Sequence, residues 1–180
     1  MSEMTTNPLL DYSGPPRFSA IRPEHAEPAL DRLLADSRAL LARVVAANTA
    51  YTWDNFAQAI EDMGERLNRM WSPVAHLNAV MNSEALRVAY NNCLPKLTEF
   101  GTALRQDERL YRAYKAIRAG AEYARLNRAQ QKIIDNALRD FRLGGAELDG
   151  PAKKRFMQVQ QELAALYSKF DENVLDATNA

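Results

Sequence analysis

The chain has 180 residues, of which 47% are hydrophobic and 26% are charged, and its 23 Lys and Arg residues balance 23 Asp and Glu residues. This apolar content excludes a wholly disordered chain, and the length suits one domain, or at most two small ones, with a buried core. The zero net charge removes the global electrostatic argument for binding nucleic acid or an anionic membrane surface.

Residues 1–20 are expected to form an extended arm. Asn7-Pro8 and Gly14-Pro15-Pro16 favour extended or turn geometry over helix. Phe18 and Ile21 are the large apolar side chains expected to hold the arm on a core. The first residues contain neither a basic region nor an apolar stretch, so the sequence shows no secretory signal.

From Pro23 onward, the hydrophobic pattern predicts helices. The first begins near Pro23 and ends near Asn48, and Pro23 suits a first helical turn. Pro28 is expected to bend the second turn or to delay the regular helix. The apolar residues of this segment recur three and four apart on one stripe: Ala26, Ala29, Leu30, Leu33, Leu34, Leu40, Leu41, Val44 and Val45.

The second and third predicted helices follow Thr52 and Ser83, which suit the N-cap position. Pro73 should kink the second helix because proline removes one hydrogen bond and clashes with the preceding turn; the third contains Pro95. The second stripe comprises Trp53, Phe56, Ile60, Met63, Leu67, Met70, Trp71 and Val74. The third comprises Leu86, Tyr90, Cys93, Leu94, Leu97, Phe100 and Leu104.

Three further helices are predicted, the fourth from near Asp107, the fifth after Asn127 and the sixth from Pro151. Gly144-Gly145 should end the fifth because glycine supplies the left-handed residue that a helix C-terminus favours. Their stripes are Leu110, Tyr114 and Ile117; Ile133, Ile134, Ala137, Leu138 and Phe141; and Phe156, Val159, Leu163, Leu166, Phe170 and Val174. No segment alternates as a half-buried strand would. We therefore expect an all-α fold of about six antiparallel helices, in a bundle or layered array over residues 21–180, after the arm of residues 1–20.

The histidines and the cysteine do not form a recognisable zinc motif. His25 and His76 lie far apart and neither precedes a Glu, so the HExxH pattern, which places two imidazoles on one helix face, is absent. We expect both histidines to be structural or on the surface, and Cys93 to be a buried, inert thiol that fits a reducing compartment. No catalytic, cofactor-binding or metal-ligating residue is assigned.

Other motifs are also missing or have ordinary interpretations. GxxxxGK[ST], GxGxxG and GxSxG do not occur, so phosphate-binding loops and hydrolase elbows lack their usual pattern. Glu61-Asp62 and Asp171-Glu172 are expected to be surface charge. Two tryptophans and two methionines share one helical stripe and are expected to be core residues rather than a ligand box: Trp53, Met63, Met70 and Trp71.

Residues 105–128 combine basic side chains with tyrosines, as a nucleic-acid surface does: Arg105, Arg109, Arg112, Lys115, Arg118, Arg125 and Arg128, with Tyr111, Tyr114 and Tyr123. Helical geometry places the first three arginines opposite Leu110, Tyr114 and Ile117, as in an ordinary polar face over a core face. We expect this face to be solvated. A basic wall facing a peptide or a partner domain is the alternative, and nucleic-acid binding is the weaker one.

Several sequence blocks are similar to one protein family. They are FSAIRPEH at 18–25, PAL at 28–30, YTWDN at 51–55, SPVAHLN at 72–78, LYRAY at 110–114, DNALRDF at 135–141 followed by Leu143 and Gly145, and NVLDAT at 173–178. In this order and over nearly the whole chain, they resemble the N-terminal region of the thimet oligopeptidase family of zinc metallopeptidases.

The resemblance implies two largely helical halves around a deep channel that admits short peptides. Hydrolysis in this family uses HExxH and a downstream Glu, which hold zinc and activate water, and these residues belong to the C-terminal part. No position in this chain matches them, so the resemblance implies no cofactor here and zinc in the full-length parent.

The leading hypothesis is therefore a domain of a cytoplasmic oligopeptidase that forms one wall of the channel. Its partners would be the catalytic C-terminal half of the same polypeptide and short peptide substrates, with no nucleic acid and no membrane. Such a piece should be inactive alone and should expose an apolar seam. The alternative is a free-standing helical protein-interaction module without catalytic activity.

Overall fold

The structure, a computed structural model, describes residues 7–46 and 50–178. The helices are α1 (Ala26–Ala46), α2 (Gln58–Val80), α3 (Glu84–Arg105), α4 (Glu108–Ala119), α5 (Arg128–Leu143) and α6 (Gly150–Thr178). Short 3₁₀ and π turns connect or precede them, and no strand occurs within the described residues. The prediction of an all-α fold with about six helices is confirmed.

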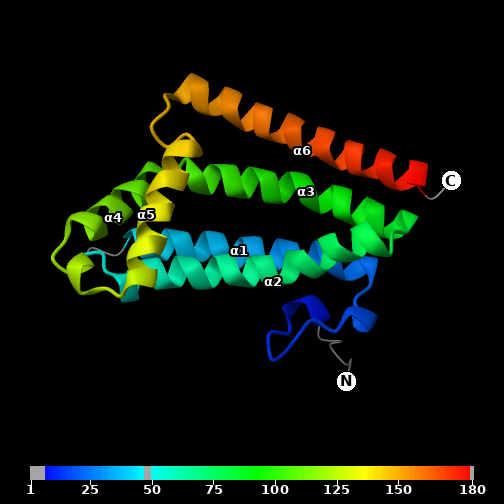
Figure 1. Ribbon diagram of the computed structural model, residues 1–180, viewed down its shortest axis with the longest axis horizontal. Coiled ribbons are helices and arrows are strands. Elements are labelled where there is room, and N and C mark those ends of the chain that lie inside the picture. Colours follow the sequence, from blue (N-terminus) through cyan, green and yellow to red (C-terminus); the bar gives the residue numbers. More distant parts are fainter. Residues whose placement is uncertain (1–6, 47–49, 179–180) are drawn as a thin grey trace.

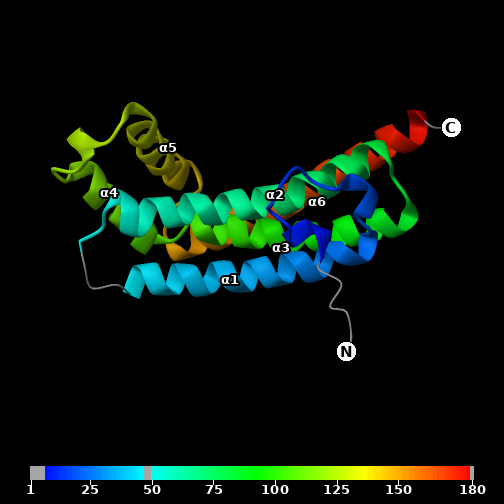
Figure 2. The ribbon, with the colours of Figure 1, turned by 90° about the horizontal axis from the view of Figure 1, so that it is seen from below.

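The helices form a bundle, with α4 and α5 lying across one of its ends (Figure 1). α1, α2 and α3 lie along the long axis of the molecule, with α2 antiparallel to both α1 and α3 (Figure 1). α4 and α5 pack on each other across the end where α1 finishes, and Figure 2 shows them rising from the bundle. From there α6 returns along α3, its main neighbour.

The expected helix starts at Thr52, Ser83, Asp107 and Asn127 are confirmed. Each of these side chains accepts a hydrogen bond from a backbone N–H two or three residues later, at 2.8 to 3.3 Å. Such caps satisfy donors that have no partner within the helix, which is why the local sequence alone locates these starts. After Thr52 the first turn is a π-helical segment, Trp53–Ala57, rather than regular α-helix.

The prolines that follow the arm lie within or just before helices, and none of them ends one. A 3₁₀ turn at Pro23–His25 precedes α1, and Pro28 lies in the first turn of α1, where a missing N–H needs no partner. The predicted delay of this helix is wrong. Its expected end near Asn48 falls outside the described residues. Pro73 and Pro95 lie inside α2 and α3, which both continue through them.

The core consists of two neighbouring clusters. The first lies among α1, α2 and α3, with Leu30, Met70, Val74 and Cys93 fully buried. The second joins α4 and α5 to the start of α2, and in it the rings of Phe56 and Tyr114 meet edge to face at 5.3 Å. Leu40, Leu41, Ile60 and Leu104 pack against both clusters, so α1 to α5 share one continuous apolar interior.

The described part of the N-terminal arm lies against α1 and α2. Leu9 and Ile21 are buried in the first cluster, whereas Phe18 is 43% exposed. Arg69 of α2 donates a hydrogen bond to the carbonyl of Gly14 at 2.7 Å. The arm contains two 3₁₀ turns and is therefore less extended than expected. The boundary between arm and domain at residue 20 stays a prediction.

Candidate docking surface

His25 and His76 occupy structural positions near the arm. His25 Nδ1 accepts the backbone N–H of Arg22 at 3.0 Å, which helps to form the turn before α1. The ring of His76, in α2, meets the edge of Phe18 with ring centroids 5.7 Å apart. Within residues 7–46 and 50–178 no three His, Cys, Asp or Glu side chains are grouped so that they could hold a metal ion.

Cys93 lies on the buried face of α3. Its side chain has no solvent exposure, and burial raises the pKa of its thiol to about 11, with the nearby Glu27 carboxylate adding to the increase. A thiol reacts as a nucleophile only in its thiolate form, which is scarce at neutral pH when the pKa is this high. The environment agrees with the expected inert cysteine.

In each of the two acidic pairs expected at the surface, the glutamate is partly buried. Glu61 is half-buried, and desolvation, reinforced by the charge of Asp62, raises its carboxyl pKa. Asp62 accepts a hydrogen bond from Gln58 at 2.8 Å. Glu172 accepts one from Asn91 of α3 at 2.7 Å and so takes part in helix packing. Asp171 and Asp62, in contrast, are exposed, as expected of surface charge.

The basic segment lacks the geometry of a nucleic-acid interface. Tyr111 and Tyr114 are buried in the second core cluster and cannot stack on bases. Arg118 pairs with Asp135 at 2.8 Å, and its guanidinium lies 4.0 Å from the ring centre of Tyr123. The positive charge of Arg118 is therefore paired with a carboxylate of the same domain. Whether the remaining basic side chains face a peptide stays a prediction.

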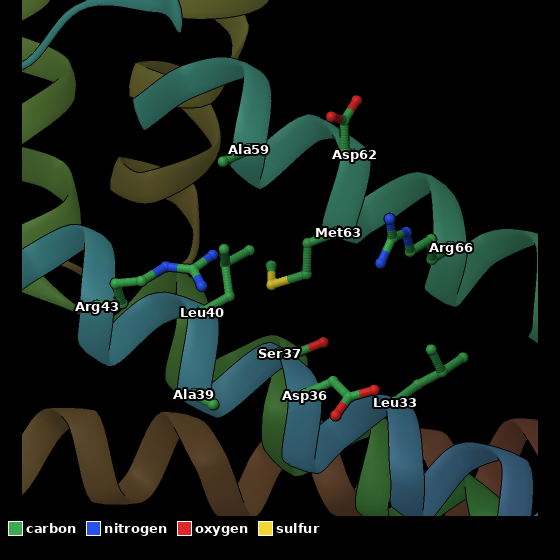
Figure 3. A pocket seen from close by; sticks show the side chains of 10 residues that line it. All are labelled: Leu33, Asp36, Ser37, Ala39, Leu40, Arg43, Ala59, Asp62, Met63 and Arg66. Atoms are coloured by element: carbon green, nitrogen blue, oxygen red, sulfur yellow. The ribbon is translucent and has the colours of Figure 1, made fainter. Parts of the chain in front are cut away.

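A groove of about 460 Å³ separates the second half of α1 from the first part of α2 (Figure 3). Leu33, Leu40 and Met63 form much of its wall, and each helix contributes one acid and one arginine to it. In Figure 3 these charged side chains, Asp36 and Arg43 from α1 and Asp62 and Arg66 from α2, surround the apolar residues. The balanced charges favour no ligand of one sign, so this groove indicates no particular chemistry.

The sixth helix has a different character from the other five. It contains no buried residue, although its stripe was predicted like the others. We call Leu163, Leu166, Tyr167, Phe170 and Val174 the α6 apolar face; their exposed fractions range from 39% to 67%. An amphipathic helix in a globular domain normally turns its apolar stripe toward the core. In α6 the later part of the stripe faces outward, whereas Phe156 and Val159 at its beginning are half-buried.

The side of α6 that contacts α3 contains a row of polar side chains, beside apolar residues such as Ala164 and Ala165 that line a hollow with Leu94 and Pro95 of α3. Ser168 donates a hydrogen bond to Asn91 at 2.9 Å, and Glu172 accepts one from the same side chain. Both terminal nitrogens of Arg87 donate to the carboxylate of Asp176, at 2.7 and 3.0 Å, and this contact lowers the pKa of that carboxyl. We call these contacts the α3–α6 polar seam.

The sequence reasoning missed the polar seam. Ser168, Glu172 and Asp176 are spaced four apart, so they share a helix face, and this spacing was the one available indication. Arg87 and Asn91 show the same spacing in α3. The pairing of these two rows depends on a contact between segments distant in sequence, which periodicity does not reveal.

Residues 30–153 match the family described as Neurolysin/Thimet oligopeptidase, N-terminal domain. The chain belongs to this family. Oligopeptidase A of Escherichia coli (strain K12) is 46% identical to the chain over 173 residues, which are 96% of the chain and 25% of that protein. Oligopeptidase A of Salmonella typhimurium (strain LT2) gives the same identity and the same coverage.

More distant family relatives also align along nearly the whole chain. Dipeptidyl carboxypeptidase of Escherichia coli (strain K12) is 24% identical over 180 residues, covering 98% of the chain and 26% of that protein. The chain thus spans about a quarter of the length of the curated relatives it matches.

Among its described helices, none is long and apolar enough to cross a membrane.

Proposed function

We propose that the chain is the N-terminal helical domain of a zinc metallo-oligopeptidase that hydrolyses short peptides. The observation that carries this proposal is the match of residues 30–153 to the N-terminal domain of the family. Relatives named oligopeptidase A align with 96% of the chain, which supports the same assignment. In this proposal the chain forms one wall of the substrate channel.

The partner of this domain is the catalytic C-terminal half of the same polypeptide. The chain corresponds to 25% of each oligopeptidase A relative, which leaves most of such a protein to supply the HExxH segment and its zinc. The outward-facing apolar residues of α6 agree with a domain that is covered by further protein. A single, buried cysteine agrees with the reducing cytoplasm as its location.

The test compares the 180-residue chain with the full-length protein. We expect the full-length protein to contain one tightly bound zinc and to cleave a quenched-fluorescence peptide, and the chain alone to do neither. Zinc hydrolysis needs several ligands converging on one ion with an open position for water. Metal analysis and peptide turnover provide the measurements. Stoichiometric zinc in the chain alone, or chelator-sensitive cleavage by it, would contradict the proposal.

A free-standing helical interaction module is the alternative, because an exposed apolar helix face also suits a protein that binds a separate partner. The two functions predict different coding sequences after residue 180. A reading frame that continues into an HExxH segment supports the peptidase, whereas a stop codon directly after Ala180 supports the module.

A further inference from the structure

In its second half, α6 exposes apolar side chains and turns a row of polar side chains toward α3, unlike an ordinary surface helix. Its polar row, Ser168, Glu172 and Asp176, contacts α3, while the α6 apolar face lies on the opposite side. At 100° per residue, Phe170 and Glu172 point about 160° apart around the helix axis. A surface helix of a folded domain normally buries its apolar side and exposes its polar side to water. The outward side therefore offers apolar surface on which another element could pack.

The α6 apolar face has the pattern of a helix-packing seam. Leu163 and Phe170 are seven residues apart, as are Tyr167 and Val174, and Leu166 lies between the first two. Such spacing keeps apolar side chains in line with a second helix and provides holes for its side chains. A shallow hollow of about 580 Å³ is lined by four of these residues together with Lys169 and Asn173.

The described elements leave most of this face exposed, although Phe170 and Val174 also line a hollow with Ala79 of α2 and Tyr90 of α3. Figure 1 shows α6 at the outer edge of the molecule, with α3 along its inner side. The helix has 29 residues and is therefore about 43 Å long. The exposed apolar row runs from Leu163 to Val174, about 17 Å along the helix, and patches of this kind mark interaction sites.

We propose that the α6 apolar face is the surface on which an amphipathic helix of the following part of the polypeptide packs. This rests on the proposed function only in requiring that such a part exists. The chain corresponds to a quarter of its oligopeptidase A relatives and matches the N-terminal domain of the family, so a full-length protein of this kind has further polypeptide that can supply such a helix.

The tether explains why this occupant is favoured over a second copy. A segment joined to α6 has an effective concentration in the millimolar range, far above that of a separate protein molecule. The polar seam contributes by holding α6 against α3, with Arg87 and Asp176 joined by two hydrogen bonds, so that its apolar side points outward.

Thiol labelling tests the proposal on the full-length protein. Phe170→Cys places a thiol in the apolar face, and Gln161→Cys places one at an exposed position of the same helix on the side that faces α3. Labelling at each site is followed by mass spectrometry of the peptide that contains it. Cys93 is buried and provides an internal reference for slow reaction.

We expect the thiol at position 170 to react at least about tenfold more slowly in the full-length protein than in the dilute 180-residue chain, because it reacts there only after local opening. The thiol at position 161 should react at similar rates in both. Equal rates at position 170 would overturn the proposal. Protection in the full-length protein that grows with protein concentration would instead identify a second copy as the occupant and would also overturn it.

A second measurement needs no cysteine substitution. Leu166→Glu combined with Phe170→Glu should lower the melting temperature of the full-length protein more than Gln161→Glu does, and equal shifts would count against the proposal. Neither measurement uses peptidase activity. A protected face in a protein that cleaves no peptide would retain this inference while refuting the proposed function.

Discussion

At the scale of single residues, Gly145 and Gly64 differ in backbone conformation and in the space available for a side chain. Gly145 has a φ of +91°, a conformation that residues with a side chain rarely adopt. A Cβ added there would lie 2.8 Å from Cδ1 of Leu148. Gly64 is exposed within α2, and a Cβ added there meets nothing within 4 Å. The first glycine is required by the turn between α5 and α6, and the second is not required by its helix.

Alanine substitutions at these glycines should therefore change stability in opposite directions. Gly145→Ala should lower the free energy of unfolding by about 1–2 kcal/mol, because of backbone strain and the contact with Leu148. Gly64→Ala should raise it by about 0.5–1 kcal/mol, because alanine is the better helix former. Urea unfolding followed by circular dichroism measures both. A neutral Gly145→Ala would show that the turn relaxes without a left-handed residue.

At the scale of helices, the polar seam predicts how α6 is attached in the 180-residue chain. Arg87→Ala removes both hydrogen bonds to Asp176 and should release the last turns of α6 from α3. Hydrogen exchange of amides 168–178 should become faster by up to about fivefold, as expected for a partly exposed ion pair, while α1 to α3 keep their protection.

Lys169→Ala is the matched control for this prediction. Lys169 pairs with Glu172 within α6 at 3.7 Å and so does not tie the helix to α3. Its removal should leave exchange in residues 168–178 nearly unchanged. Equal acceleration in both variants would mean that α6 frays by itself and that the seam contributes no attachment.

Helix position and helix orientation differ in how well the sequence predicts them. Thr52, Ser83, Asp107 and Asn127 begin helices through contacts within three residues, so the sequence predicts these starts correctly. The apolar stripe of α6 was predicted equally well. The surroundings of that stripe depend on whether another element covers it, and a local pattern contains no information about that.

The sequence contains no motif that points to α6, so the α3–α6 polar seam could not be predicted from motifs. The arrangement that singles out α6 combines Arg87 and Asn91 with side chains more than 75 positions later in the chain. Periodicity identifies both rows as polar faces but does not pair them. The family resemblance, in contrast, depends on residue identity within short blocks, and the match over residues 30–153 confirms it.

At the scale of the whole molecule, α1 to α5 share an apolar core, and α6 packs on the outside of it. The two apolar clusters share Leu40, Leu41, Ile60 and Leu104, so α1 to α5 should unfold together. No residue of α6 belongs to either cluster. Substitutions on the α6 apolar face should therefore affect association without greatly changing the stability of the core, since exposed positions typically contribute within about 0.5 kcal/mol.

This separation predicts reversible self-association of the 180-residue chain at high concentration. In the chain alone the α6 apolar face has no cover, and pairing of two such faces would remove apolar surface from water. Leu166→Glu combined with Phe170→Glu should shift the chain toward monomer, because pairing would then bury unpaired charges. Gln161→Glu adds charge to the same helix outside the face and should leave association unchanged. Sedimentation velocity over a range of concentrations measures the effect, and a wild-type chain that stays strictly monomeric throughout would contradict the assignment of this face as an interface.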